Sequence, residues 1–139
     1  MEELFDRTKL AVVIAGIALV AGAKTMVAHH SFAAEFDASK TFKMTGPVTK
    51  VEWMNPHIWF FVDVTDEAGK VTNWGFSGGA PGILQRRGIR RDSMKVGDVV
   101  VVEGFRARDG SNNASGGRVT FADGSQVFTA SPGDRTPGQ

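Results

Sequence analysis

The stretch of residues 53–64 constrains the fold of this chain more than any other, because it combines a turn with the start of a core strand. Over residues 58–65 one face of the segment is wholly apolar and the other is mixed. Such period-two alternation is typical of a half-buried β-strand. Asn55 and Pro56 come just before it, and this pair favours a type I turn. His57 is therefore expected in a turn at the entrance of a core strand.

The rest of the chain divides into short β-branched and aromatic segments separated by turn residues, which predicts an all-β domain. Gly46 and Pro47 lie inside the first of these segments and indicate a bulge or a bend. One short helix is expected over residues 80–88, where a proline stands in the first turn and a glycine follows the last. The expected strands are residues 41–53, 58–65, 70–76, 99–105 and 118–121, with residues 126–129 as a short hairpin partner.

Three strands, one short helix and two strands follow each other in the order of an OB-fold, a five-stranded Greek-key barrel. The helix of that fold lies between strands three and four, and the bent first strand serves both halves of the barrel. A β-sandwich and an SH3-like barrel remain as alternatives. Alternation predicts that Phe60 and Val101 point into the core. The loops that border the ligand face of an OB-fold correspond here to residues 54–57 and 108–117.

The N-terminal segment differs in composition from the rest, with an apolar block from Leu10 to Ala23. At ~1.5 Å per residue this block is too short to cross ~30 Å of hydrocarbon comfortably, but it matches the apolar region of a secretory signal. We expect residues 1–28 to be a signal peptide, cleaved after Ala23 or Ala28, and a membrane anchor facing the periplasm is the alternative. The mature domain is then residues 29–130, periplasmic or secreted, and residues 131–139 are expected to be a disordered tail.

Composition and missing motifs exclude several classes of function. The chain has no cysteine, so no disulfide stabilises an exported form. Its formal net charge is only +1, which argues against a nucleic-acid partner. The sequence has no serine elbow, no phosphate-binding glycine loop and no close pair of carboxylates, so we do not expect an enzyme. A small binding module, or an accessory subunit that presents its barrel face to a protein partner, fits better, with membrane contact only if the N-terminal segment is retained.

The three histidines form the first candidate site. His29 and His30 lie in an arm ahead of the first strand, and His57 lies in the first hairpin turn. If the arm of residues 32–40 folds back beside the first strand, the three imidazoles meet. Neutral imidazole suits copper and zinc, so the predicted ligand is Cu(II) or Zn(II). The alternative is that the paired histidines are solvated and that His57 only hydrogen-bonds within its turn.

Aromatic, amide and basic side chains form two further candidates. Tryptophans on a barrel face stack on flat ligands, and polar loop residues complete such a site. The predicted ligand-binding residues are Asn55, Trp59, Trp74, Asp109 and Asn112. The alternatives are core packing for the tryptophans and simple turn formation for the polar residues. A basic set suits an anionic partner, or else is a solvated helix end. It consists of Arg86, Arg87, Arg90, Arg91 and Lys95.

Several short motifs together resemble a family of small exported bacterial proteins of unknown function. They are His29-His30-Ser31-Phe32, Gly46 with Val48, Glu52-Trp53-x-Asn55-Pro56-His57, Trp74, and Gly97-Asp98. The resemblance covers residues 28–129 and implies export and a compact β-domain. It assigns no catalytic residue, because the family has no established activity.

Overall fold

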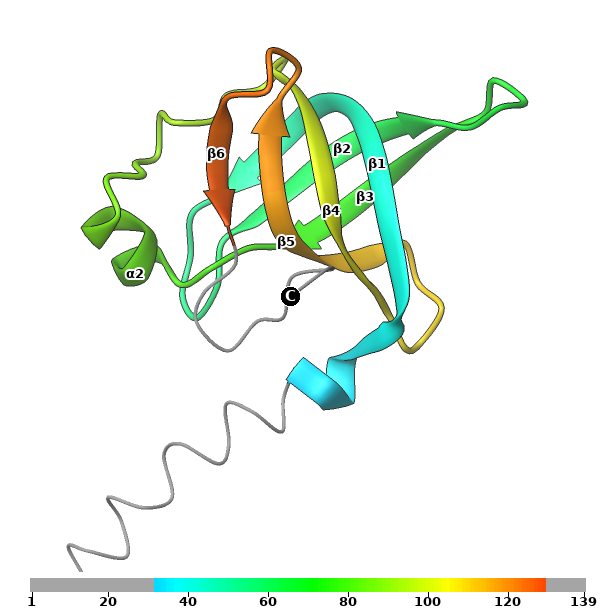
Figure 1. Cartoon of the computed structure of the whole chain (residues 1–139), viewed down its shortest axis with the longest axis horizontal. Coiled ribbons are helices and arrows are strands. Elements are labelled where there is room, and N and C mark those ends of the chain that lie inside the picture. The colour runs from blue at the N-terminus through cyan, green and yellow to red at the C-terminus, as the bar shows by residue number, and fades with distance from the viewer. Residues whose placement is uncertain (1–31, 130–139) are drawn as a thin grey trace, which may run out of the picture. The chain divides into compact units, whose positions relative to one another are not determined.

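The computed structural model describes residues 32–129, and residues 33–129 of these belong to the compact unit Ala33–Gln139 (Figure 1). The predicted signal peptide and C-terminal tail lie outside the described residues. Six strands and one complete helix are seen in the described part. They are β1 (Phe36–Glu52), β2 (Trp59–Thr65), β3 (Val71–Ser77), α2 (Pro81–Arg86), β4 (Val99–Ala107), β5 (Asn113–Phe121) and β6 (Gln126–Thr129).

The sheet closes into a barrel. Its strand order is β3-β2-β1-β4-β5-β6, and an additional parallel pairing joins β3 to β5. All the other pairings are antiparallel, and α2 lies between β3 and β4 in the chain. This is the expected OB-type arrangement. The predicted hairpin partner is also present, as β6 alongside β5.

β1 is the strand that links both halves of the barrel. Its first part, up to Pro47, pairs with β4, and its last part, from Val48, pairs with β2. The register shifts between Val48 and Lys50, just after Gly46 and Pro47, so the predicted bend is present. The strand starts at Phe36, earlier than expected. Residues 36–40 are therefore part of β1, with a register shift against β4 between Phe36 and Thr41, and residues 32–35 are helical. The expectation of an extended arm folded back beside the first strand is wrong for this part.

β5 is also longer than the sequence indicated. We expected a loop over residues 108–117, but Asn113 to Gly117 belong to the strand, and only residues 108–112 connect β4 to β5. Residues 114–117 are buried. Their small size lets β5 pass between β4 and β3, with Ser115 paired to Phe105 on one side and to Ser77 on the other. These residues look like a loop in the sequence but serve close backbone packing.

The core fills the barrel with apolar side chains from every strand. Phe60 is fully buried, as predicted, and its ring stacks on that of Phe76 with centroids 5.3 Å apart. Val101 is only half-buried, whereas Val100 and Val102 are fully buried, so the inward orientation predicted for Val101 is wrong by one residue. Val101 lies between Thr45 and Thr120 on the outer face of the sheet.

The short helix α2 is fixed by one buried face. Pro81 and Leu84 are buried, and Gly88 follows the helix with a φ of 83°, as the sequence pattern predicted. None of the helices within residues 32–129 has the length and apolar character needed to cross a bilayer.

Candidate functional site

The connection between β1 and β2 positions His57. It bends at Asn55 and Pro56, and the peptide bond between these two residues is cis. The N–H of Ile58 donates to the carbonyl of Gly79, which ties the end of the connection to the segment after β3. The ring of His57 is half-buried, and its Nδ1 lies 3.3 Å from the hydroxyl oxygen of Ser77. Because Nδ1 makes this contact, Nε2 is the ring nitrogen that remains to bind a ligand.

An aromatic row continues from this point along the outer face of β2. Trp59 and Phe61 are half-buried on the face opposite to Phe60. Phe61 lies opposite Gly75 of β3, where a Cβ atom would come within 3.1 Å of its ring. Glycine at this position therefore lets the aromatic ring lie directly over the backbone of β3. The strands that carry this row are those that OB-folds use to bind ligands.

Charged and amide side chains surround the aromatic row. Lys50 lies 5.5 Å from the ring centroid of Phe61 and also pairs with the carboxylate of Glu52. Further along, the amide of Asn73 donates to the carboxylate of Asp63 at 2.7 Å. A cation over an aromatic ring and polar groups at the edge are typical of surfaces that bind flat, polar molecules.

The loop between β4 and β5 contributes less than the sequence indicated. Ser111 holds the pKa of Asp109 below its ordinary value, and the backbone N–H of Ser111 donates to the Asp109 carboxylate at 2.9 Å. This carboxylate therefore organises its own turn. The carbonyl of Asn112 accepts a hydrogen bond from the N–H of Gly75, which places this predicted residue beside the aromatic row. The next residue, Asn113, was missed, although its amide oxygen lies close to Gly75.

Trp74 does not belong to this surface. Its side chain is 8% exposed and packs in the core, and the guanidinium of Arg106 lies 4.9 Å from its ring centroid. The structure thus corrects its predicted role in stacking on a ligand. Trp53 also packs against the core from a half-buried position, while Asn55 is exposed in the β1–β2 connection. Trp59, Asn112 and His57 are the predicted residues that lie on or beside the outer face of β2 and β3.

The histidine cluster can be followed only at His57, since His29 and His30 lie outside the described residues. Within residues 32–129, no three side chains among histidine, aspartate and glutamate come together as a metal site. His57 follows the C-terminal end of β1, whereas the other two histidines precede its N-terminal end. Because residues 36–40 are part of β1, the route by which the histidines were expected to meet is not the one the chain takes.

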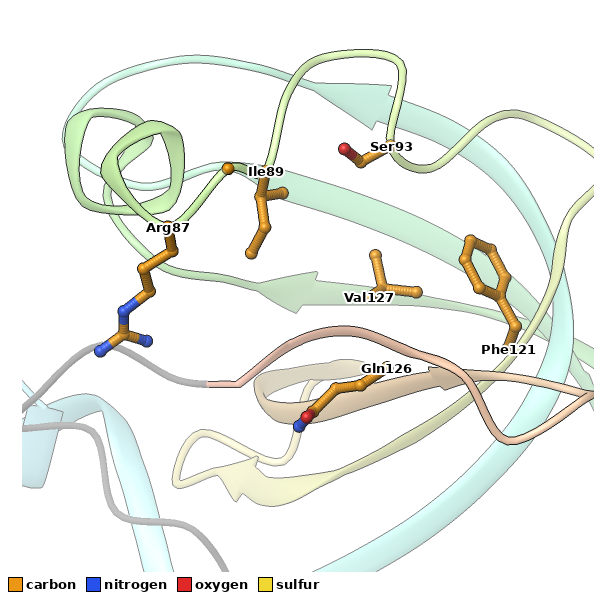
Figure 2. Close-up of a pocket in the computed structure, with 7 residues that line it drawn as sticks. Arg87, Ile89, Ser93, Phe121, Gln126 and Val127 are labelled. Atoms are coloured by element: carbon orange, nitrogen blue, oxygen red, sulfur yellow. The ribbon is translucent and has the colours of Figure 1, made fainter.

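A second concave surface, which we call the β6 groove, was not predicted. It is an open groove of about 480 Å³ between the α2–β4 connection and the end of the β5–β6 hairpin (Figure 2). Ile89, Phe121 and Val127 give it an apolar floor. Arg90 and Arg91 border a smaller hollow that shares Ile89 and Val127 with it. The groove is lined by Arg87, Gly88, Ile89, Ser93, Phe121, Gln126 and Val127. The basic run at residues 86–95 was the one sequence signal for this surface.

The geometry defines a small closed β-barrel of the OB type with an aromatic outer face and a separate groove. The chain belongs to DUF6152, a family of unknown function whose profile matches residues 15–117. This confirms the resemblance to a family without an established activity. No curated protein and no solved structure gives a match.

Proposed function

We propose that this protein is a small exported binding module that holds a ligand and does not catalyse a reaction. The observation that carries the proposal is the row formed by His57, Trp59 and Phe61 on the strands that OB-folds use for ligands. We further propose that the module binds Cu(II) or Zn(II) with His57 as one ligand. His29 and His30 are the other candidate ligands, and they would have to reach His57 by a route other than an arm folded back along β1.

The contact between His57 and Ser77 supports the proposal that His57 binds a metal ion. Histidines that bind metals usually hydrogen-bond through their second ring nitrogen, and such a contact orients the ring. In His57 the nitrogen near the Ser77 hydroxyl is Nδ1, at 3.3 Å, so Nε2 is the expected donor to the metal. His57 is half-buried, so part of the residue is accessible to solvent.

We expect the substitution His57→Ala to abolish most of the Cu(II) affinity, because it removes a ligand. Ser77→Ala retains the imidazole but loses its orienting partner, so it should weaken binding by about tenfold or more. Affinity should also fall as the pH is lowered, because only neutral imidazole binds the metal. Titration calorimetry on protein without an affinity tag measures all three effects, and nitrogen hyperfine splitting in the Cu(II) spectrum reports the number of imidazoles.

The double variant His29→Ala with His30→Ala provides the second arm of this test. If both histidines are ligands, it should lose affinity and nitrogen hyperfine lines while the urea midpoint stays the same. Unchanged Cu(II) and Zn(II) affinity in both this variant and His57→Ala would exclude the metal site. The histidines would then be a solvated pair and a turn residue.

Export is proposed on the apolar block from Leu10 to Ala23 and the small residues that follow it. We expect protein isolated from the producing cell to begin at Lys24 or His29. N-terminal sequencing and intact mass measure this directly. A chain that begins at Met1 and fractionates with membranes would instead be an anchored form.

A second candidate function is that of an accessory subunit that presents part of its barrel surface to a protein partner. The β6 groove favours it, since an apolar floor beside exposed arginines is typical of the centre and rim of a protein interface.

A further inference from the structure

The edge of the sheet at β6 is the first feature of the β6 groove that limits what can bind there. β6 is last in the strand order, and within residues 32–129 it pairs only with β5. In Figure 1 it lies between β5 and the α2–β4 connection. Gln126 and Val127 of β6 line the groove from one side, and Ile89 and Ser93 line it from the other. An unpaired strand edge along a groove is a template for an added extended segment.

The side chains of the groove indicate what such a segment carries. Its floor is apolar, and a small hollow continues from it toward Trp53 and Met94. This arrangement suits a segment with an apolar side chain at every second position, because alternate residues of an extended strand point to the same side.

The charge of the α2–β4 connection indicates which side chains the bound segment carries at its remaining positions. Residues 86–95 carry five basic side chains, and Asp92 is the single acidic one. Arg86, Arg90 and Arg91 are exposed and make no ion pair with another residue of the described part. The guanidinium group binds carboxylates in a bidentate manner, so carboxylates are the complementary groups.

We infer that the β6 groove binds an extended acidic segment of a protein partner, which adds to β6 as a further strand and places carboxylates near Arg90 and Arg91. The inference rests on the second proposed function, that of an accessory subunit. A single-stranded nucleic acid would also complement arginines, but such strands bind by stacking their bases on exposed rings, and the one aromatic ring of the groove, Phe121, is half-buried in its floor. A strand edge, by contrast, recognises a peptide backbone.

The test uses the full mature chain and a synthetic peptide of alternating glutamate and valine, titrated at low salt. Amide chemical shifts in the nitrogen-proton NMR spectrum map the contact, and fluorescence anisotropy of the labelled peptide gives Kd. We expect shifts at residues 88–93 and 126–129. A peptide of alternating lysine and valine should give none of them.

Charge reversal provides the matched control. The double substitution Arg90→Glu with Arg91→Glu should weaken binding by about tenfold or more, because it exchanges two attractions for two repulsions. Lys40→Glu with Lys70→Glu changes the net charge by the same amount on exposed residues away from the groove and should leave Kd within about twofold. Thermal unfolding of both variants verifies that the barrel is intact.

The outcomes separate the inference from the function on which it rests. Shifts confined to the outer face of β2 and β3 would show that the groove is not the binding site, while the proposed function of binding a partner would stand. If neither peptide at millimolar concentration shifts any amide signal, both the groove as a binding site and the accessory function would be overturned. Three other outcomes would each show that an acidic segment is not the occupant. They are equal weakening of binding by the two charge-reversed pairs, tighter binding of a single-stranded DNA oligomer than of the acidic peptide, and self-association of the protein through the arginines.

Discussion

Replacement of Phe60 by alanine is expected to lower the free energy of unfolding by about 3–5 kcal/mol. The side chain is fully buried, stacks on Phe76, and lies against the backbone of Gly116, where a Cβ atom would come within 3.0 Å of its ring. The cavity that the substitution leaves cannot collapse easily, because the closed sheet holds the neighbouring strands in place. Since small domains have a total stability of about 5–15 kcal/mol, the variant should be close to unfolding. Urea denaturation followed by tryptophan fluorescence measures the change.

Two controls make this prediction specific to the inner face of the barrel. Trp59→Ala removes a larger ring from the half-buried outer face of the same strand and should cost less. Val101→Ala should cost less than Val100→Ala or Val102→Ala, because only the latter two side chains are fully buried. A larger loss for Trp59→Ala than for Phe60→Ala would mean that the face assignment of β2 is reversed.

Gly104→Ala is expected to destabilise the barrel by about 3 kcal/mol or more, at the upper end of the usual cost of overpacking. A Cβ atom at this position would lie 1.7 Å from the carbonyl oxygen of Ser115. That oxygen belongs to the backbone of β5, which is paired with β4 on one side and with β3 on the other, so it cannot move aside without opening the closure. Hydrogen exchange should show early opening of β3 and β5.

Gly82→Ala is the matched control for this substitution. A Cβ atom at Gly82 would meet only the end of the Arg86 side chain, at 3.7 Å, and alanine favours the helical conformation of α2. We expect its stability to stay within about 1 kcal/mol of the original chain. Equal urea midpoints for the two alanine variants would show that the contact between Gly104 and Ser115 does not limit the closure.

The amino-acid sequence by itself determined the local elements of this protein. Alternation in residues 58–65 fixes the register of β2, because an error of one residue would turn the apolar face outward. Gly46 and Pro47 indicate the bend of β1, since neither residue supports a regular central strand. Pro81 and Gly88 mark the ends of α2 for similar backbone reasons. The order of these elements was enough to predict the OB-type barrel.

The tertiary structure decided what has no local signal. Residues 99–102 are four consecutive valines, so they carry no alternation, and only pairing with β1 and β5 decides that Val100 and Val102 face inward. The small residues of β5 look like a loop in the sequence. Their role is to let the backbones of β3 and β4 come close to β5, and this role is visible only when those strands are in place. The β6 groove likewise joins residues 87–93 to residues 121–127. Its shape depends on the path of the whole barrel, which is why the sequence indicated the arginines but not the surface beside them.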